Sequence, residues 1–193
     1  MSPKNAVTPS AAGLRALAHP TRLKMLGLLR LEGPATATML AKQLRLNSGA
    51  TSYHLRQLAE HGFIEDDHER GDARDRWWRA AHQSTDAGRT SDTEADADVM
   101  ESFFHSVALL YIETLMQAVA ERRYLPRAWQ EASTTSDFHL RLSAGRAEQL
   151  VEAIFELVQG WEEQPDADET TDFVVNLNAF PRPGTVVLEG EDE

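Results

Sequence analysis

The chain has 193 residues, contains no cysteine and carries a net charge of −12. This length permits one or two domains with a substantial core, and the missing cysteines exclude a disulfide framework, a zinc ribbon and a thiolate sensor. No apolar run approaches about 20 residues, so we expect no membrane span. The polar start MSPKNAVTPS lacks the core of a signal peptide, which indicates a cytoplasmic protein.

The chain begins with a polar stretch followed by two predicted helices. Residues 1–9 are polar, and we expect a flexible N-terminus there. A first helix is predicted over Ser10–Ala18, with its serine as the N-cap. A second is predicted over Pro20–Leu31, because proline suits the first helical position and leucines recur at helical spacing.

Two further helices follow, joined by a short turn. The first is predicted over Thr36–Leu44 and the second over Asn47–Gly62, where either Asn47 or Ser48 is a good N-cap and glycine a good helix end. The turn between them is Arg45–Asn47. Helix, three-residue turn and helix is the helix-turn-helix layout, in which the second helix reads DNA.

The second of these helices has two contrasting faces. Thr51, Leu55 and Leu58 form an apolar stripe, and the opposite stripe carries small, aromatic or hydrogen-bonding side chains without carboxylates. Such a helix suits a major groove, where Gln57 can pair with adenine and Arg56 can bind a phosphate. The candidate DNA contacts are Ser48, Ala50, Ser52, Tyr53, His54, Arg56 and Gln57. The alternative is an ordinary surface helix in a protein-interaction module.

A strand, a polar hairpin and a second strand are predicted next, over Phe63–Glu65, Asp66–Asp75 and Arg76–Ala81. This arrangement after a recognition helix is a wing. The wing arginines Arg70, Arg74 and Arg76 could contact phosphates or a minor groove. Because aspartates and a glutamate are interleaved with them, the alternative is a set of exposed ion pairs, each of which contributes little.

These segments together resemble the winged-helix domain of ArsR-type bacterial transcription regulators, over about Ala11–Ala81. The most specific pieces are LAHPTRLKMLGLL at Leu17–Leu29 and TSYHLRQLAEHGFIE at Thr51–Glu65, followed by the RWW of the wing. The resemblance implies a DNA-binding winged helix-turn-helix fold. It also implies that Ser52 and His54 face DNA, with Tyr53 at the variable reading position between them.

Beyond the wing, residues 83–98 are polar, acidic and nearly free of apolar side chains, which predicts a linker. A long helix is then predicted over Val99–Tyr124, with an apolar band too wide for packing on one small domain. Such a helix often packs against its twin in a dimer. The candidate dimerisation residues are Phe103, Phe104, Val107, Leu110, Tyr111 and Leu115.

The last third predicts a strand–helix–strand unit. The alternating strands are Asp137–Leu142 and Phe173–Phe180, and the helix runs from Ser143 to about residue 163. The expected class is therefore α+β, with a winged helix-turn-helix domain at 10–82, a linker at 83–98, the long helix and C-terminal α/β domain at 99–182, and an acidic tail at 183–193. The aromatic residues of this region could line a ligand pocket or form a plain core.

Metal and enzyme chemistry find little support. Asp98, Glu101 and His105 share one face of the long helix, but no second histidine follows them there, so we expect no metal and no cofactor. The chain has no glycine-rich phosphate loop, no HExxH and no nucleophile elbow, which argues against an enzyme.

Charge is divided unevenly along the chain. Residues 1–83 hold 12 Lys and Arg against 8 Asp and Glu, a net charge of +4, whereas residues 84–193 hold 7 against 23, a net charge of −16. A mildly basic head can bind a polyanion even on an acidic body. The sequence thus predicts a homodimeric regulator, a repressor by default, on an inverted repeat of double-stranded DNA. A small organic effector, a protein partner or no effector all remain open, and the alternative function is a winged-helix module that binds a protein.

Overall fold

The computed structural model describes residues 6–70, 75–85, 94–161 and 170–187. The helices are α1 (Ala11–Leu17), α2 (Pro20–Leu31), α3 (Ala37–Leu44), α4 (Ser48–Glu60), α5 (Glu94–Glu121), α6 (Arg127–Ala132) and α7 (Ala144–Gln159), with a 3-10 turn, η1, at Arg122–Tyr124. The strands are β1 (Ala6–Val7), β2 (Ala35–Thr36), β3 (Ile64–Asp66), β4 (Trp77–Ala80) and β5 (Ser84–Thr85). The chain divides into two compact units, Met1–Thr134 and Thr135–Glu193.

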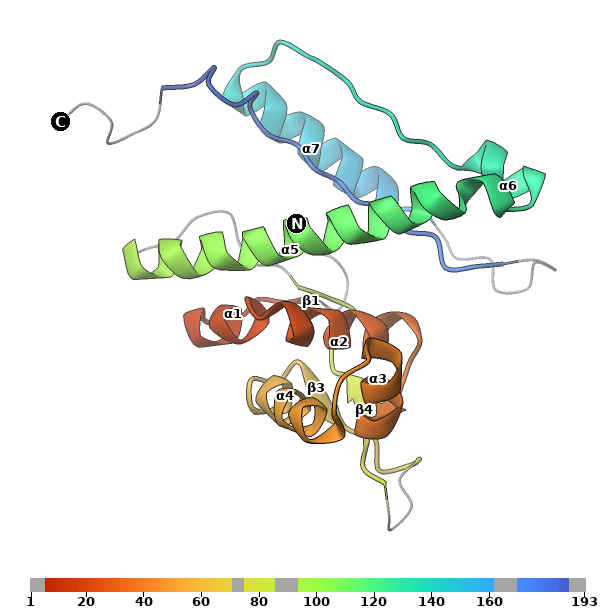
Figure 1. Cartoon of the computed structure of the whole chain (residues 1–193). Coiled ribbons are helices and arrows are strands. Elements are labelled where there is room, and N and C mark those ends of the chain that lie inside the picture. Colours follow the sequence, from red (N-terminus) through yellow and green to blue (C-terminus); the bar gives the residue numbers. More distant parts are fainter. Residues whose placement is uncertain (1–5, 71–74, 86–93, 162–169, 188–193) are drawn as a thin grey trace. The chain divides into compact units, whose positions relative to one another are not determined.

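The first unit is a winged helix-turn-helix domain with a long helix added. Its small antiparallel sheet has the order β2-β4-β3, in which Trp78 of β4 lies opposite Ala35 of β2 and Asp66 of β3. Figure 1 shows α1 and α2 as a layer between α5 on one side and the α3–α4 pair with the sheet on the other. The expected α+β class, with helix-turn-helix, wing and long helix, is confirmed.

One continuous core holds this unit together. Leucines and a methionine of α1, α2, α3 and α4 meet Ile64 and Trp78 of the wing strands and Phe63 just before β3. The side chains of Val99 and Phe103 of α5 complete the cluster. Each helix contributes an apolar stripe at helical spacing, so that the elements bury one another's apolar faces. The wing strands and the recognition helix therefore share one packed base.

A short parallel pair of strands, missed in the sequence, lies where the linker was predicted. β1 pairs with β5, and β1 lies within the N-terminal stretch expected to be flexible. Arg30 of α2 donates from Nε to the carbonyl of His82 (2.9 Å) and from Nη2 to the hydroxyl of Thr85 (2.9 Å). Burial lowers the pKa of Arg30 to about 10. The predicted linker is thus shorter than expected at both ends, since α5 already begins at Glu94.

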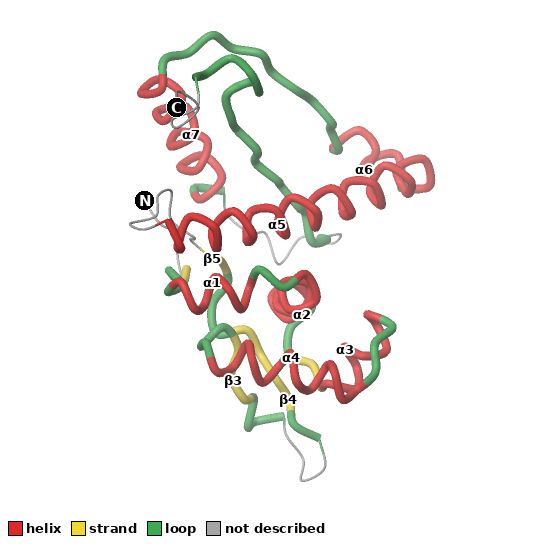
Figure 2. The backbone as a smooth tube through the Cα atoms, turned by 60° about the vertical axis from the view of Figure 1, so that its left-hand side comes forward, coloured by secondary structure: helices red, strands yellow, loops and turns green. Residues whose placement is uncertain are grey.

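The second unit contains α7, but the two strands predicted on either side of it are wrong. Residues 137–142 and 173–180 form no strand, and Figure 2 draws both as loop rather than strand. Alternation predicts only which side chains would share a face, whereas a strand also needs a neighbour to complete its backbone hydrogen bonds.

One described helix, Asp96–Tyr124, is long and apolar enough to cross a membrane by length and composition, although no span was expected from the sequence. This is weak evidence, because a core helix of a soluble protein passes the same test. In the present fold that helix is held on the winged-helix domain by two polar contacts. The Ser106 hydroxyl donates to the Ala18 carbonyl (2.6 Å), and Lys24 Nζ lies 2.5 Å from Glu113 Oε2.

Candidate nucleic-acid interface

The recognition helix α4 is fixed by its N-cap and its buried stripe. The Asn47 side chain accepts the backbone N–H of Ala50 at 2.7 Å, which satisfies one of the free donors of the first turn. Thr51, Leu55 and Leu58 are fully buried on the side that meets α2 and the sheet. Past the helix end, Gly62 adopts a positive φ of 74°, a conformation that other residues reach at a cost.

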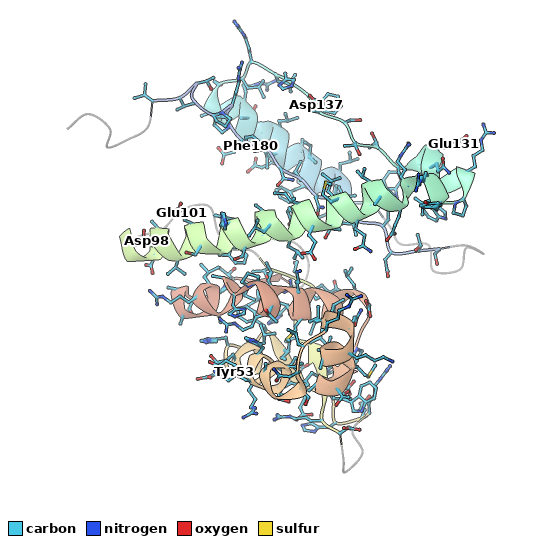
Figure 3. The ribbon with its side chains drawn as sticks, viewed as in Figure 1. Tyr53, Asp98, Glu101, Glu131, Asp137 and Phe180 are labelled. Carbon is cyan, nitrogen blue, oxygen red and sulfur yellow. The ribbon has the colours of Figure 1, made fainter. Side chains whose placement is uncertain are left out.

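The opposite side of α4 is open to solvent. Tyr53, labelled in Figure 3, keeps 54% of its surface exposed, Ser48 and Arg56 are exposed, and Ala50 is half-buried. Gln57 is engaged within the helix, because its amide donates to Glu60 Oε2 at 2.9 Å. The sequence suggested a face without carboxylates, but the carboxylate of Glu60 lies beside Gln57 in the structure. A base that pairs with Gln57 must first displace this contact.

A hollow of about 300 Å³ lies beside this face. It is formed by the first turn of α3, by α4 and by the base of the wing, and its lining is Thr36, Ala37, Thr38, Ser52, Arg56, Asp75, Arg76 and Trp78. The α3 N-terminus presents backbone N–H groups and a partial positive charge there, and the guanidinium groups of Arg56 and Arg76 outnumber the single carboxylate of Asp75. Such a hollow suits a backbone phosphate, since phosphate oxygens accept from both kinds of donor.

The contribution of α3 to this hollow was not predicted from the sequence. Thr38 is exposed in the first turn of α3, and the Thr36 side chain caps that turn by accepting the Met39 N–H at 3.3 Å. The capping threonine was visible in the sequence as the first residue of the predicted helix. Its nearness to Ser52 and Arg56 depends on the angle between the two helices, which periodicity does not define.

The wing arginines are paired with neighbouring carboxylates. Arg76 Nε lies 2.5 Å from Asp66 Oδ2, and its guanidinium stacks on the Trp78 ring at 4.1 Å from the centroid. Arg70 Nε lies 3.8 Å from Asp67 Oδ2. Arg74 falls outside the described residues. In the free protein Arg70 and Arg76 thus form the ion pairs that were the alternative interpretation. More than half of each arginine side chain is still exposed to solvent, so a phosphate can reach it.

His54 faces inward to α2, although the resemblance implied a DNA-facing role. Its ring lies 4.6 Å from that of His19 and 5.5 Å from that of Tyr53, measured between centroids. Its Nδ1 is buried and finds no hydrogen-bond partner among the described residues. Burial, then the neighbouring His19 and Arg22, lower the pKa of His54. His54, which burial keeps neutral, therefore packs between the His19 ring and the ring of the exposed Tyr53.

The HPTR sequence at 19–22 explains how this support is built. The His19 Nδ1 accepts the Thr21 N–H at 3.2 Å and so caps α2, while proline occupies the first turn. The Arg22 guanidinium donates to the carbonyls of Ala16 and Arg15 at the end of α1. Burial lowers the pKa of His19, with Arg22 as the next cause. One short motif thus closes α1, opens α2 and provides the ring against which α4 packs.

The candidate dimerisation residues of α5 divide into two groups. Phe103 is 5% exposed in the core of its own subunit, and Val107 packs against the same core, so neither is free for a partner. Leu110 and Tyr111 are half-buried. Phe104 and Leu115 are exposed. Further along α5 the large apolar side chains of Ile112, Met116 and Val119, which were not among the candidates, are also exposed.

The carboxylates and histidine considered for a metal lie along the open side of the same helix. Asp98 and Glu101, labelled in Figure 3, and His105 are all exposed. Among the described residues, no group of three or more His, Cys, Asp or Glu side chains is close enough to hold a metal ion.

A comparison with known protein families agrees with the helix-turn-helix geometry of the first unit. A family model described as "Helix-turn-helix domain" matches residues 17–67, from the end of α1 to the start of the wing. Among solved structures, a mutant of Lactococcus lactis ZitR in its apo form matches with 18% identity and a TM-score of 0.34, covering 73% of this chain and 83% of that chain. No curated protein matches the chain.

The family match and the wing strands together identify a winged helix-turn-helix domain in the first unit, a fold that DNA-binding proteins commonly use. The match covers the helix-turn-helix domain in general, and the ArsR-type resemblance is a finer assignment than it provides.

Proposed function

We propose that this chain is a sequence-specific regulator of the ArsR type that binds an inverted repeat as a homodimer and represses by occupying its operator. The observation that carries the proposal is the hollow beside α4, where Arg56 and Arg76 flank a space of about 300 Å³ next to the exposed Tyr53. A surface that combines a phosphate site with an exposed reading helix serves both positioning and base recognition.

In this proposal α4 enters the major groove while the hollow holds a phosphate of the adjoining backbone. Tyr53 and Gln57 contact base edges, and Gln57 exchanges its Glu60 contact for an adenine. Arg56, whose Nε donates to the Ser52 carbonyl at 3.2 Å, turns its remaining donors to the phosphate. The net charge of +4 on residues 1–83 supports a modest electrostatic attraction.

The homodimer part of the proposal is supported by the unburied second half of α5. Ile112, Leu115, Met116 and Val119 recur at three- and four-residue intervals and are all exposed. A helix normally buries such a stripe. A two-fold contact through this stripe would bring two winged-helix domains to half-sites about 34 Å apart. Sedimentation that finds only monomers at micromolar concentration would remove this part of the proposal.

An effector site in the C-terminal region is not formed by the second unit alone. No described side chain of this unit is buried, so its aromatic residues enclose no pocket by themselves. An organic effector there would need further residues from outside this unit to surround it.

The test is a titration of the full chain with fragments of its own upstream DNA at several salt concentrations. A regulator retards one fragment that contains an inverted repeat, and its affinity falls with salt. A winged-helix module that binds a protein partner retards none of them. Retardation of every fragment alike would contradict sequence-specific reading.

Variants separate reading from positioning. Tyr53→Ala and Gln57→Ala relax sequence preference, with a cost of about 1–3 kcal/mol at the base pair that is read. Arg56→Ala weakens binding to all sequences equally and flattens the salt dependence. Arg127→Ala is the control, because this arginine of α6 is exposed and pairs with Glu131 at 2.8 Å, outside the helix-turn-helix. Unchanged specificity in both face variants would contradict the assignment of α4.

A further inference from the structure

The second unit, Thr135–Glu193, has no interior in a single subunit. No described side chain of it is buried, and fifteen of its large apolar side chains are exposed. Five of these are aromatic and keep between 44% and 86% of their surface in contact with solvent: Phe138, Phe155, Trp161, Phe173 and Phe180. A unit of this size cannot be stable without a core of its own. Something outside this unit must therefore cover these side chains.

The exposed area is of the size that a stable dimer buries. At 150–250 Å² for a whole aromatic side chain, the five rings alone leave roughly 700 Å² exposed. A standard interface buries about 800 Å² per partner, and a typical monomer leaves at most a few hundred Å² in one apolar patch. The exposed aliphatic side chains of α7 and of the flanking segments add to this area.

The two segments that flank α7 are strands by sequence pattern but not by pairing. Residues 137–142 alternate Phe138, Leu140 and Leu142 with polar side chains, and residues 173–180 are rich in β-branched and aromatic residues. Neither segment forms a strand in the single subunit. An extended, apolar segment without ladder partners is a template for pairing with another chain.

The charge pattern indicates what kind of chain pairs with these two segments. Residues 84–193 carry a net charge of −16, yet FVVNLNAF at 173–180 has no charged residue. In the other segment Asp137 and Arg141 cancel, and Asp137 Oδ2 lies 2.9 Å from His139 Nε2. A surface for a basic partner would place carboxylates beside the apolar side chains. A second copy of this acidic chain can approach only along segments that carry no net charge, and two-fold symmetry makes the same patch face itself.

We propose that a second copy of this chain completes the second unit. Residues 137–142 and 173–180 become strands when they pair with the same segments of the partner subunit, and the apolar side of α7 packs on the shared sheet. This inference rests on the homodimer part of the proposed function and does not depend on DNA binding.

The direct test is amide hydrogen exchange of the full chain above and below the dimer midpoint, which sedimentation equilibrium defines. Amides of 137–142 and 173–180 are protected at high concentration and lose protection on dilution, while those of α4 stay protected at both. Protection that does not depend on concentration would assign the sheet to one subunit and overturn the proposal. The absence of protection at every concentration would also overturn the proposal. Protection that appears only when phosphatidylcholine vesicles are added would show that a lipid surface, and not a second copy, covers these segments.

A matched pair of variants gives a second readout. Val175 is 60% exposed in the second unit and Leu31 is 57% exposed at the end of α2, so a glutamate at either position leaves a single subunit intact. Val175→Glu raises the dimer dissociation constant at least about tenfold, because it places a charge in the shared sheet. Leu31→Glu leaves it within about twofold, as expected for a surface substitution. Equal dimerisation of the two variants would overturn the proposal.

The absence of cysteine from the sequence allows a third readout on a folded dimer. Single-cysteine variants at each position from 173 to 180 are oxidised mildly, and only the position nearest the two-fold axis forms a disulfide between subunits, because every other residue of an antiparallel self-paired strand lies opposite a different residue of the partner. The single variant Leu31→Cys serves as the control and stays unlinked. Retarded operator DNA with no cross-link in the series would refute the shared sheet alone. Cross-linking with no retarded DNA would refute the regulator alone.

Discussion

The two units of this chain use similar proportions of apolar residues in opposite ways. In the first, α1, α2, α3, α4 and the wing enclose a common core, and the apolar positions predicted for the recognition helix are fully buried. In the second, the single helix α7 and the segments beside it bury no described side chain. The difference teaches that an amphipathic pattern reports a need for burial, whereas the number of neighbouring elements decides whether one subunit can meet it.

The largest expected contrast between the units is in core truncation. Leu55→Ala removes a fully buried side chain of α4 and should lower the free energy of unfolding by about 2–5 kcal/mol. Leu157→Ala removes an exposed side chain of α7 and should leave unfolding of the monomer unchanged. Urea unfolding at a concentration where the chain is monomeric measures both. A comparable loss in the two variants would show that the second unit has an interior of its own.

Helix capping gives the next contrast. The Asn47 side chain caps α4, whereas Ser143, at the start of α7, makes no side-chain cap hydrogen bond. Asn47→Ala should therefore cost about 0.5–2 kcal/mol of stability. Ser143→Ala should have no measurable effect in the monomer. Thermal unfolding followed by circular dichroism distinguishes the two, and equal effects would contradict the difference in capping.

The histidine pair of the first unit predicts a pH dependence. His54 and His19 have lowered pKa values in the folded chain, so at a pH between the folded and ordinary values the unfolded chain binds more protons. Stability is complete above the ordinary value of about 6.5 and declines as the pH falls through it. Tm should drop between about pH 7.5 and about pH 5.5, and His54→Gln should reduce that drop. The same drop in the variant would show that His54 has no part in it.

The smallest effect concerns the ion pair that joins α5 to α2. Lys24 and Glu113 are partly exposed, and such pairs contribute about 0–1 kcal/mol. Glu113→Gln should accordingly shift the free energy of unfolding by less than about 1 kcal/mol, and less again at high salt. A larger loss, measured by urea unfolding at two salt concentrations, would mean that this contact and not the buried Val99 and Phe103 fixes α5 on the domain.

Local patterns predicted the first unit well. The capping residues Ser10, Thr36 and Asn47 stand where the structure starts its helices, and each side chain accepts a backbone N–H of the first turn. β1, β2 and β5 were missed, because two-residue strands carry no periodicity. The strands of the second unit were predicted and do not form, because pairing depends on a neighbour that the pattern cannot supply.

The candidate site was predictable in its exposed parts and not in its contacts. The exposure of Tyr53 and the burial of Leu55 follow from helical spacing, which the sequence contains. The stack of His54 on His19 joins residues 35 positions apart, and the hollow that includes Thr38 depends on how three elements meet. These features require the helix crossing angles, and no single segment encodes an angle between two helices.

The pairing of Arg76 with Asp66 also affects how salt titrations of this protein should be interpreted. An arginine that already faces a carboxylate neutralises a DNA phosphate incompletely, so fewer condensed cations leave the duplex than there are guanidinium contacts. The slope of log affinity against log salt would then undercount the arginines at the interface. Asp66→Asn would steepen that slope without adding any new contact. The increase in slope would measure how much of the positive charge of Arg76 is neutralised by Asp66 in the wild-type protein.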